Sequence, residues 1–374
     1  MKTNPLLKLH SLGQSIWLDF IRREMLDSGE LEDLIRNDAL RGVTSNPAIF
    51  EKAIDGSTDY DDAIRTLRQE NKSVAEIYEV LIVEDVQHAA DLLAPVYQET
   101  NGRDGFVSIE VSPHLAYDTS GTVAEAKRLW LAVDRHNVMI KVPGTQEGLP
   151  AITQLISEGI NVNVTLLFGL PRYRQVFAAY MDGLKERVDA GRPLNTVVSV
   201  ASFFLSRIDV LVDPMLEKLM QGDNRNPTTA LAVRLHGQTA IASAKKAYQI
   251  CQKMIGSEHF SQFEEKRGNT QRLLWASTST KNPDYSDVKY VEALIGPDTI
   301  NTLPLDTLNA YRDHGHPARR LDVDVDEATA VLDGLAELGI DLDEVTEQLE
   351  KEGVQKFIKP YDRLMDTLKT KGLE

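Results

Sequence analysis

The sequence contains a single cysteine, Cys251, among its 374 residues. One cysteine cannot form a disulfide within the chain or build a cysteine-based metal site, and such a composition suits a reducing compartment. Cys251 lies in a helical pattern with no activating partner beside it, so a buried, small hydrophobic role is favoured over that of a nucleophile. The sequence therefore offers no cysteine chemistry.

Basic residues are scarce relative to acidic ones. The chain has 41 lysines and arginines against 57 aspartates and glutamates, which gives a formal net charge of −16. A surface of this sign repels nucleic acids and anionic lipids. We therefore expect no nucleic-acid partner, and we expect any anionic small ligand to bind in a local basic pocket.

Long apolar runs are also missing. No stretch approaches the roughly 18 consecutive apolar residues of a membrane span. The first 20 residues lack the apolar core and the cleavage site of a signal peptide. We therefore expect a cytoplasmic protein with no membrane partner. The composition is compatible with either a monomer or a homodimer.

Several catalytic signatures are absent from the sequence. It has no H-E-x-x-H zinc motif, no G-x-S-x-G nucleophile turn and no G-K-[ST] phosphate loop. The lack of G-x-G-x-x-G after the first predicted strand disfavours a dinucleotide-binding fold. The pair His314 and His316 is more typical of a solvated loop than of a metal site. We expect neither a metal nor an organic cofactor.

Short β-branched runs alternate with helical patterns along most of the chain. One connecting segment, residues 122–136, has Val123, Ala126 and Leu129 at helical spacing. Alternation of this kind produces parallel β/α units, and eight units predict a closed (β/α)₈ TIM barrel better than an open sheet. The predicted strands are residues 15–20, 41–46, 106–111, 138–143, 160–168, 196–204, 272–278 and 299–304.

Two segments exceed what a plain barrel needs. The link between the sixth and seventh strands is long, contains the polar stretch "QGDNRNPTT" and predicts extra helices. Residues 321–374 form an acidic helical extension whose apolar stripe consists of Tyr361, Leu364, Met365 and Leu368. We expect this stripe to pack on the outside of the barrel or across one end. Residues 1–374 would then be one barrel domain that carries the extension.

Polar residues occur towards the carboxyl end of almost every predicted strand. The carboxyl ends of barrel strands converge on one mouth, where the active sites of this fold lie. A single Asn, Ser or Thr at a strand end is more often simply solvated. The charged residues Lys141 and Glu110 within the set make a catalytic pocket the better interpretation. The set consists of Asp19, Asn46, Glu110, Lys141, Asn163, Thr165, Ser202 and Ser277.

Lys141 is the most informative residue of this set. It is flanked by Met139, Ile140 and Val142, so its charge must find a partner or be lost. Burial disfavours the ammonium form of a lysine, and a neutral amine attacks a carbonyl to form an imine. An imine permits cleavage of a neighbouring C–C bond, and carboxyl groups in the same mouth would supply the proton transfers. The alternative is a purely structural ion pair between Lys141 and Glu110.

The sequence resembles the transaldolases, which are Schiff-base enzymes of the pentose phosphate pathway. The matching stretches are "GVTSNPAIF", "VSIEVSPHLAYDT", "MIKVPGTQEGLPAI", "GINVNVTLLF", "SFFLSRID" and "LLWASTSTKNP". The resemblance implies transfer of a dihydroxyacetone unit from sedoheptulose 7-phosphate or fructose 6-phosphate to glyceraldehyde 3-phosphate or erythrose 4-phosphate. The alternatives are a fructose 6-phosphate aldolase and a non-catalytic barrel that binds sugar phosphates.

The resemblance also implies roles for individual residues. Lys141 would form the imine, and Asp19 would act as acid and base. Glu110 and Thr165 would hold a catalytic water. The residues implied in substrate binding are Asn46, Asn163 and Ser202 for the sugar and Arg207 and Ser277 for the phosphate.

Two further positions bear on the choice of substrate. In the resembling families, the position of Phe204 is phenylalanine in transaldolases and tyrosine in fructose 6-phosphate aldolases, which favours the transferase here. Transaldolases commonly carry an arginine two residues after the serine of the seventh strand, where this chain has Ser279. Lys281 is the nearest cation and is expected to contact the phosphate, although a lysine lacks the two-pronged geometry of an arginine.

Overall fold

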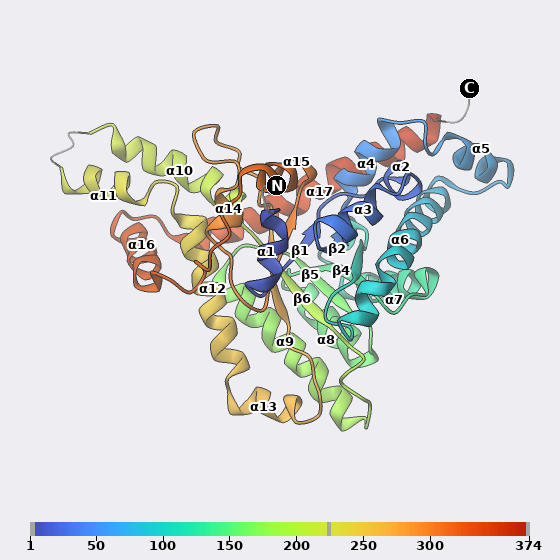
Figure 1. Ribbon diagram of the computed structural model, residues 1–374, viewed down its shortest axis with the longest axis horizontal. Coiled ribbons are helices and arrows are strands. Elements are labelled where there is room, and N and C mark those ends of the chain that lie inside the picture. Colours follow the sequence, from blue (N-terminus) through green and yellow to red (C-terminus); the bar gives the residue numbers. More distant parts are fainter. Residues whose placement is uncertain (1–3, 223–225, 372–374) are drawn as a thin grey trace.

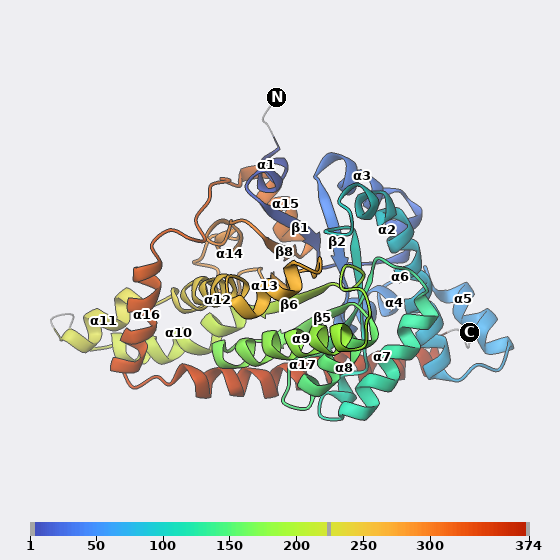
Figure 2. The same ribbon diagram turned by 90° about the horizontal axis from the view of Figure 1, so that it is seen from below.

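A closed barrel of eight parallel strands forms the centre of the protein (Figures 1 and 2). The computed structural model describes residues 4–222 and 226–371. Neighbouring strands pair in chain order, and β1 closes the ring by pairing with β8. The predicted (β/α)₈ fold is confirmed. The strands are β1 (Gln14–Leu18), β2 (Leu40–Thr44), β3 (Phe106–Glu110), β4 (Val138–Pro143), β5 (Val162–Leu167), β6 (Ser199–Phe204), β7 (Arg272–Ala276) and β8 (Thr299–Leu303).

Each predicted strand is present, but several end earlier than predicted. Asp19, Asn46 and Ser277 lie just beyond β1, β2 and β7, on the loops that follow them. Local conformation explains two of these ends. The Asn46 side chain caps the next helix, and Ser277 has a φ of +55°, outside the extended region of a regular strand. Short polar side chains therefore end the ladders at the mouth of the barrel.

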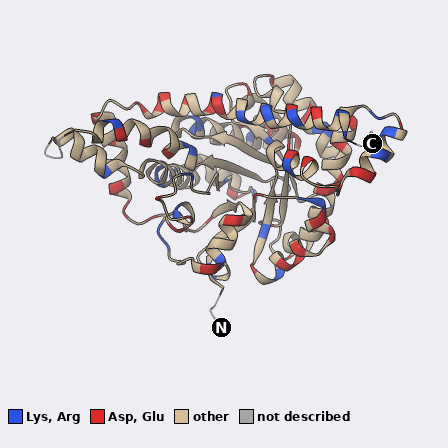
Figure 3. Ribbon diagram, turned by 90° about the horizontal axis from the view of Figure 1, so that it is seen from above, with Lys and Arg blue, Asp and Glu red and all other residues tan. Residues whose placement is uncertain are grey.

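The helices between the first six strands surround the barrel. The strands are buried on both faces of the sheet. Most charged residues lie on the surrounding helices, as Figure 3 shows. The helix predicted at residues 122–136 is α7, which begins and ends three residues earlier. These helices are α2 (Arg23–Asp27), α3 (Glu30–Asn37), α4 (Pro47–Asp55), α5 (Asp61–Gln69), α6 (Val74–Glu99), α7 (Thr119–Val133), α8 (Gly148–Glu158) and α9 (Leu170–Asp189).

The predicted extra helices between the sixth and seventh strands are present. They are α10 (Ser206–Met220), α11 (Pro227–Leu235), α12 (Thr239–Ile255) and α13 (Glu258–Glu264). Cys251 is buried in α12, as expected. The short helices α14 (Lys289–Glu292) and α15 (Leu305–His314) lie before and after β8, and α1 (Pro5–Ser11) precedes β1. Among the helices of the described residues, none has the length and apolar composition to cross a membrane.

The C-terminal extension consists of α16 (Val325–Glu337) and α17 (Leu342–Thr370). Figures 1 and 2 show α17, in red, running from the side of α10 and α16 to the side of α4. Leu364 and Leu368 of the predicted stripe are fully buried. Earlier in α17, Gly353 packs against Leu166 and Phe168 at the carboxyl end of β5. The extension therefore packs across the carboxyl end of the barrel.

Candidate active site

A cavity of about 160 Å³ opens at the carboxyl end of the barrel. It continues outward into a wider vestibule that shares Asp19, Asn46, Arg207 and Lys281 with it. The convergence of polar residues on one pocket, predicted from the strand ends, is therefore present in the structure. Of the predicted site residues, the cavity is lined by Asp19, Asn46, Lys141, Thr165, Ser202, Phe204, Arg207, Ser277 and Lys281.

Lys141 and Glu110 lie side by side because they are register partners on neighbouring strands. The Lys141 Nζ is 3.3 Å from Oε2 of Glu110 and donates a hydrogen bond of 2.9 Å to the carbonyl of Ser45. Their side chains are 5% and 4% exposed. Burial raises the pKa of Glu110, and the charge of Lys141 offsets part of this rise. A buried amino group and a buried carboxyl group thus share one wall of the barrel.

Apart from the ion pair of Glu110 with Lys141, two buried oxygens beside the amine have no hydrogen-bond partner among residues 4–222 and 226–371. They are Oε2 of Glu110 and Oγ1 of Thr165. Glu110 is on β3 and Thr165 is on β5, the two strands that flank the strand of Lys141. Buried polar atoms are nearly always hydrogen-bonded to protein or to ordered water. The two oxygens are therefore suited to hold a water molecule next to the amine.

Asp19 lies on the opposite side of the cavity, directly after β1. Its Oδ1 accepts a hydrogen bond of 2.8 Å from Thr44, whose hydroxyl lies 2.7 Å from the hydroxyl of Thr302. Burial raises the pKa of Asp19, and the charge of Lys141 is the largest influence that lowers it. Sequence reasoning did not single out Thr44 or Thr302, although each is a polar residue near the end of a strand. Both line the cavity.

Two cations form the outer part of the cavity. Arg207 is on the first turn of α10, and its guanidinium carbon lies 5.3 Å from the ring of Phe204 and 5.7 Å from the ring of Phe357. The Lys281 Nζ donates a hydrogen bond of 2.6 Å to Ser279. Burial lowers the pKa of Lys281, and the charge of Arg207 lowers it further. An anion between the two cations would relieve this repulsion.

Asn163 lies beneath the cavity and does not line it. Its Nδ2 donates to the hydroxyl of Ser108 at 3.0 Å, and its Oδ1 accepts from the hydroxyl of Ser202 at 2.6 Å. Ser202 lines the cavity, so Asn163 orients a residue that a ligand would touch. Asn46 lines the cavity while its Oδ1 accepts from the backbone of Ile49 as the cap of α4.

Phe357 of α17 completes the cavity and was not predicted as a site residue. Its ring centroid is 6.5 Å from that of Phe204, and the Lys141 Nζ is 5.9 Å from the ring. Phe168 packs on the other side of Phe204 with a centroid distance of 5.3 Å. A sequence signal existed, because Phe357 extends the apolar stripe of the C-terminal helix by one turn before Tyr361. The stripe therefore brings an aromatic ring to the reacting region.

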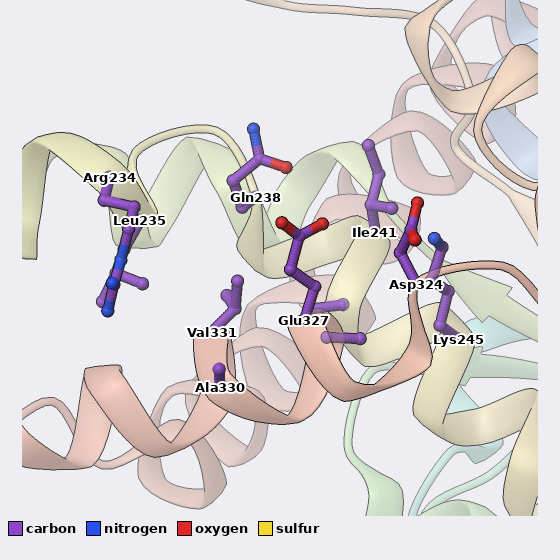
Figure 4. A pocket seen from close by; sticks show the side chains of 11 residues that line it. Arg234, Leu235, Gln238, Ile241, Lys245, Asp324, Glu327, Ala330 and Val331 are labelled. Atoms are coloured by element: carbon purple, nitrogen blue, oxygen red, sulfur yellow. The ribbon is translucent and has the colours of Figure 1, made fainter.

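A second cavity, of about 390 Å³, lies between α12 and α16, away from the barrel mouth (Figure 4). It is lined by Arg234, Lys245, Asp324 and Glu327 over small apolar side chains. These charged residues are exposed or half-buried, and none of the predicted site residues is among them. Its larger volume does not make it the catalytic site, because it lacks buried reactive groups.

The described part of the chain holds no group of three or more His, Cys, Asp or Glu residues placed to bind a metal ion. The two histidines of the "HGH" stretch were expected to form a solvated loop. His314 lies at the surface, where its ring contacts Asp287 and Asp313. Neither His314 nor His316 is among the residues that line the cavity or its vestibule.

A closed β/α barrel with a buried lysine and a carboxyl group at its carboxyl mouth defines a class of enzyme that acts on carbonyl compounds through an amine. The model of the Transaldolase/Fructose-6-phosphate aldolase family matches residues 16–368, and the chain belongs to this family. The predicted resemblance is confirmed.

Curated relatives match the chain over nearly its whole length. A transaldolase of Trichodesmium erythraeum is 48% identical and covers 99% of this chain and 98% of the relative. A transaldolase of Thiobacillus denitrificans is 47% identical over 95% of this chain and 96% of its own. A transaldolase of Thermobifida fusca is 45% identical over 97% of both chains. The predicted transaldolase function and transferase class are confirmed, and a lysine Schiff base is general to the family.

Proposed function

We propose that Lys141 is the amine that performs the transaldolase reaction in this chain. The donor would be sedoheptulose 7-phosphate or fructose 6-phosphate, and the acceptor glyceraldehyde 3-phosphate or erythrose 4-phosphate. The observation that carries the proposal is the place of Lys141, which is buried within a strand and yet lines the cavity at the mouth. A purely structural ion pair would not need its amine at a cavity wall.

The first step is formation of the imine. The amine of Lys141 attacks the carbonyl carbon of the ketose, and the carbinolamine loses its hydroxyl group as water after receiving a proton. Glu110 is the nearest acid, since its Oε2 lies 3.3 Å from the amine. Burial raises the pKa of Glu110, so the group retains a proton for this transfer at a higher pH than an exposed carboxyl would.

The second step is cleavage of the sugar. Asp19 accepts the proton of the hydroxyl on the fourth carbon, the bond between the third and fourth carbons breaks, and its electrons pass to the imine to form an enamine. The aldose product leaves, a new aldose binds, and the enamine attacks its aldehyde while Asp19 returns the proton. The rings of Phe204 and Phe357 cover this region and keep water from the enamine, which favours transfer over release.

The phosphate of both substrates would occupy the outer part of the cavity. Arg207 and Lys281 supply positive charge there, and Ser277 supplies a hydroxyl group. Arg207 lies on the first turn of α10, whose dipole also favours an anion. This basic pocket lets a chain of net charge −16 bind an anionic sugar.

Trapping of the imine tests the proposal. Reduction with borohydride in the presence of fructose 6-phosphate should leave a three-carbon adduct on Lys141, because glyceraldehyde 3-phosphate departs before reduction. Mass spectrometry of the digested protein identifies the modified lysine. An adduct on another lysine would contradict the assignment. Rapid release of free dihydroxyacetone without an aldose acceptor would instead support the aldolase alternative.

Arg207→Ala should raise KM for phosphorylated donors by about one to two orders of magnitude, since a charge-assisted contact contributes roughly 1.5–3 kcal/mol. Activity with free dihydroxyacetone as donor and unphosphorylated glyceraldehyde as acceptor should change little. Initial rates with both donors measure the difference. Arg172→Ala is a matched control, because Arg172 pairs with Glu350 between α9 and α17 and lies outside the cavity. An equal loss with both donors would show that Arg207 has a structural role.

A further inference from the structure

The loop after β7, residues 277–288, carries Lys281 and is here named the β7–α14 loop. Two side-chain hydrogen bonds hold its beginning. The hydroxyl of Ser277 lies 2.8 Å from that of Ser206, and the hydroxyl of Thr278 donates to the carbonyl of Thr302 at 2.9 Å. Lys281 lies three residues beyond the second of these bonds. Its position therefore also depends on how the far end of the loop is held.

Two buried carboxylates of α10 hold the far end of the loop. The hydroxyl of Tyr285 donates to Oδ2 of Asp213 at 2.6 Å. Oδ2 of Asp209 accepts from the hydroxyl of Tyr290 at 2.7 Å and from Nζ of Lys289 at 3.0 Å. Asp209 and Asp213 are 1% and 5% exposed. Buried carboxylates with charged or hydroxyl donors form strong, directional contacts.

The second oxygen of each carboxylate binds the start of α12. Oδ1 of Asp209 accepts from the backbone N–H of Ala240 at 2.8 Å, and Oδ1 of Asp213 accepts from that of Gly237 at 2.9 Å. The two aspartates are four residues apart and so lie on one face of α10. Each carboxylate therefore joins α10 and the start of α12 to a third segment, which is the loop itself for Asp213 and α14 for Asp209.

The contact between Tyr285 and Asp213 is closely fitted. Gly237 has a φ of +72°, and a Cβ atom on it would lie 2.6 Å from the Tyr285 hydroxyl, so glycine makes room for the tyrosine. The Lys289 Nζ lies 3.5 Å from the centroid of the Tyr285 ring. Burial and the Asp213 carboxylate raise the pKa of Tyr285, so its hydroxyl remains protonated and donates.

Helix α10 carries Arg207, one of the two cations proposed to bind the phosphate. It also holds the loop that carries the other cation, Lys281. Arg207 is on the first turn of α10, two residues before Asp209. We propose that Asp209, Asp213 and Tyr285 are positioning residues that hold the β7–α14 loop so that Lys281 faces Arg207 across the phosphate. This inference rests on the proposed function, because it takes the phosphate to lie between these two cations.

Tyr285→Phe tests the inference, because it removes the hydroxyl group and leaves the ring in place. The Ki of inorganic phosphate and the KM for fructose 6-phosphate should each rise about three- to tenfold, the range expected for one lost hydrogen bond. The value of kcat should stay within about twofold. KM for free dihydroxyacetone as donor should not change. A role in packing alone would leave the Ki of phosphate at the wild-type value, and that result would overturn the inference.

Tyr180→Phe is the matched control. Tyr180 also donates a hydrogen bond of 2.6 Å, to the carbonyl of Asn269, and lies outside the cavity. Its loss should leave the Ki of phosphate unchanged. Asp213→Asn keeps an acceptor for Tyr285 and should be closer to wild type than Asp213→Ala. Equal effects of Tyr285→Phe, Asp213→Asn and Asp213→Ala on phosphorylated and unphosphorylated donors would contradict a positioning role.

Failure of the inference and failure of the proposed function give different results. If phosphate does not inhibit the wild type and Arg207→Ala has no selective effect on phosphorylated donors, the phosphate site is wrongly assigned. If phosphate inhibits the wild type, Arg207→Ala weakens that inhibition and Tyr285→Phe does not, the site is correct and the positioning role is wrong.

Discussion

Replacing Lys141 with methionine is expected to lower kcat for transfer from fructose 6-phosphate to erythrose 4-phosphate by at least about four orders of magnitude. The reason is chemical, since no amine remains to form the imine. Methionine keeps an unbranched apolar chain, which suits a side chain that is 5% exposed. Glu110 loses its neighbouring positive charge, which raises the pKa of Glu110 further and favours the neutral acid.

Lys141→Arg separates imine chemistry from a structural ion pair. Arginine keeps the positive charge beside Glu110 but is not a nucleophile at neutral pH. An enzyme that needed only the ion pair would retain much of its activity with arginine, whereas imine chemistry predicts an inactive protein. Lys185→Met is the control, because Lys185 pairs with Asp189 on the surface of α9. Steady-state rates and thermal unfolding of the variants distinguish lost chemistry from lost folding.

The architecture was predictable because each barrel strand is short, apolar and bounded by polar residues. In β4, the run from Val138 to Pro143 has the same bounds in prediction and structure. Predicted ends were wrong where a short polar side chain binds the local backbone. The side chain of Asn46, for example, caps α4, so β2 ends before Asn46 and not at it as predicted. Such local contacts compete with the hydrogen bonds between strands. They depend on backbone geometry that the pattern of apolar residues does not specify.

The inner part of the candidate site was predictable for a related reason. Residues at strand ends must converge once the barrel closes, so Lys141 and Asp19 could be placed together without coordinates. Contacts between distant segments could not be predicted in this way. Tyr285 reaches Asp213 across 72 positions of the chain, and neither residue lies at a strand end. Phe357 reaches the cavity because α17 crosses the mouth, which depends on how that helix packs.

Glu110→Gln is expected to lower kcat by about two to three orders of magnitude, the usual contribution of a positioned proton donor. Glutamine keeps the size of the side chain but cannot give up a proton during loss of water from the carbinolamine. Trapping with borohydride should still label Lys141, at a much lower rate. Glu125→Gln is a matched control, because Glu125 accepts from the backbone of Ser112 and has no contact with the amine. Equal losses in the two variants would contradict the assigned role.

The pH dependence of the rate gives a second, independent readout of the two carboxyl groups. Burial raises the pKa of both Asp19 and Glu110. Asp19 must be ionised to accept a proton from the sugar, so the rate should fall on acidification at a pH above the usual range of about 4 for exposed carboxyl groups. Glu110 must be protonated to act as an acid, so its ionisation should lower the rate as the pH rises. In Glu110→Gln this alkaline decline should disappear while the acid decline, which belongs to Asp19, remains. Persistence of both declines in the variant would assign the proton donor to another group.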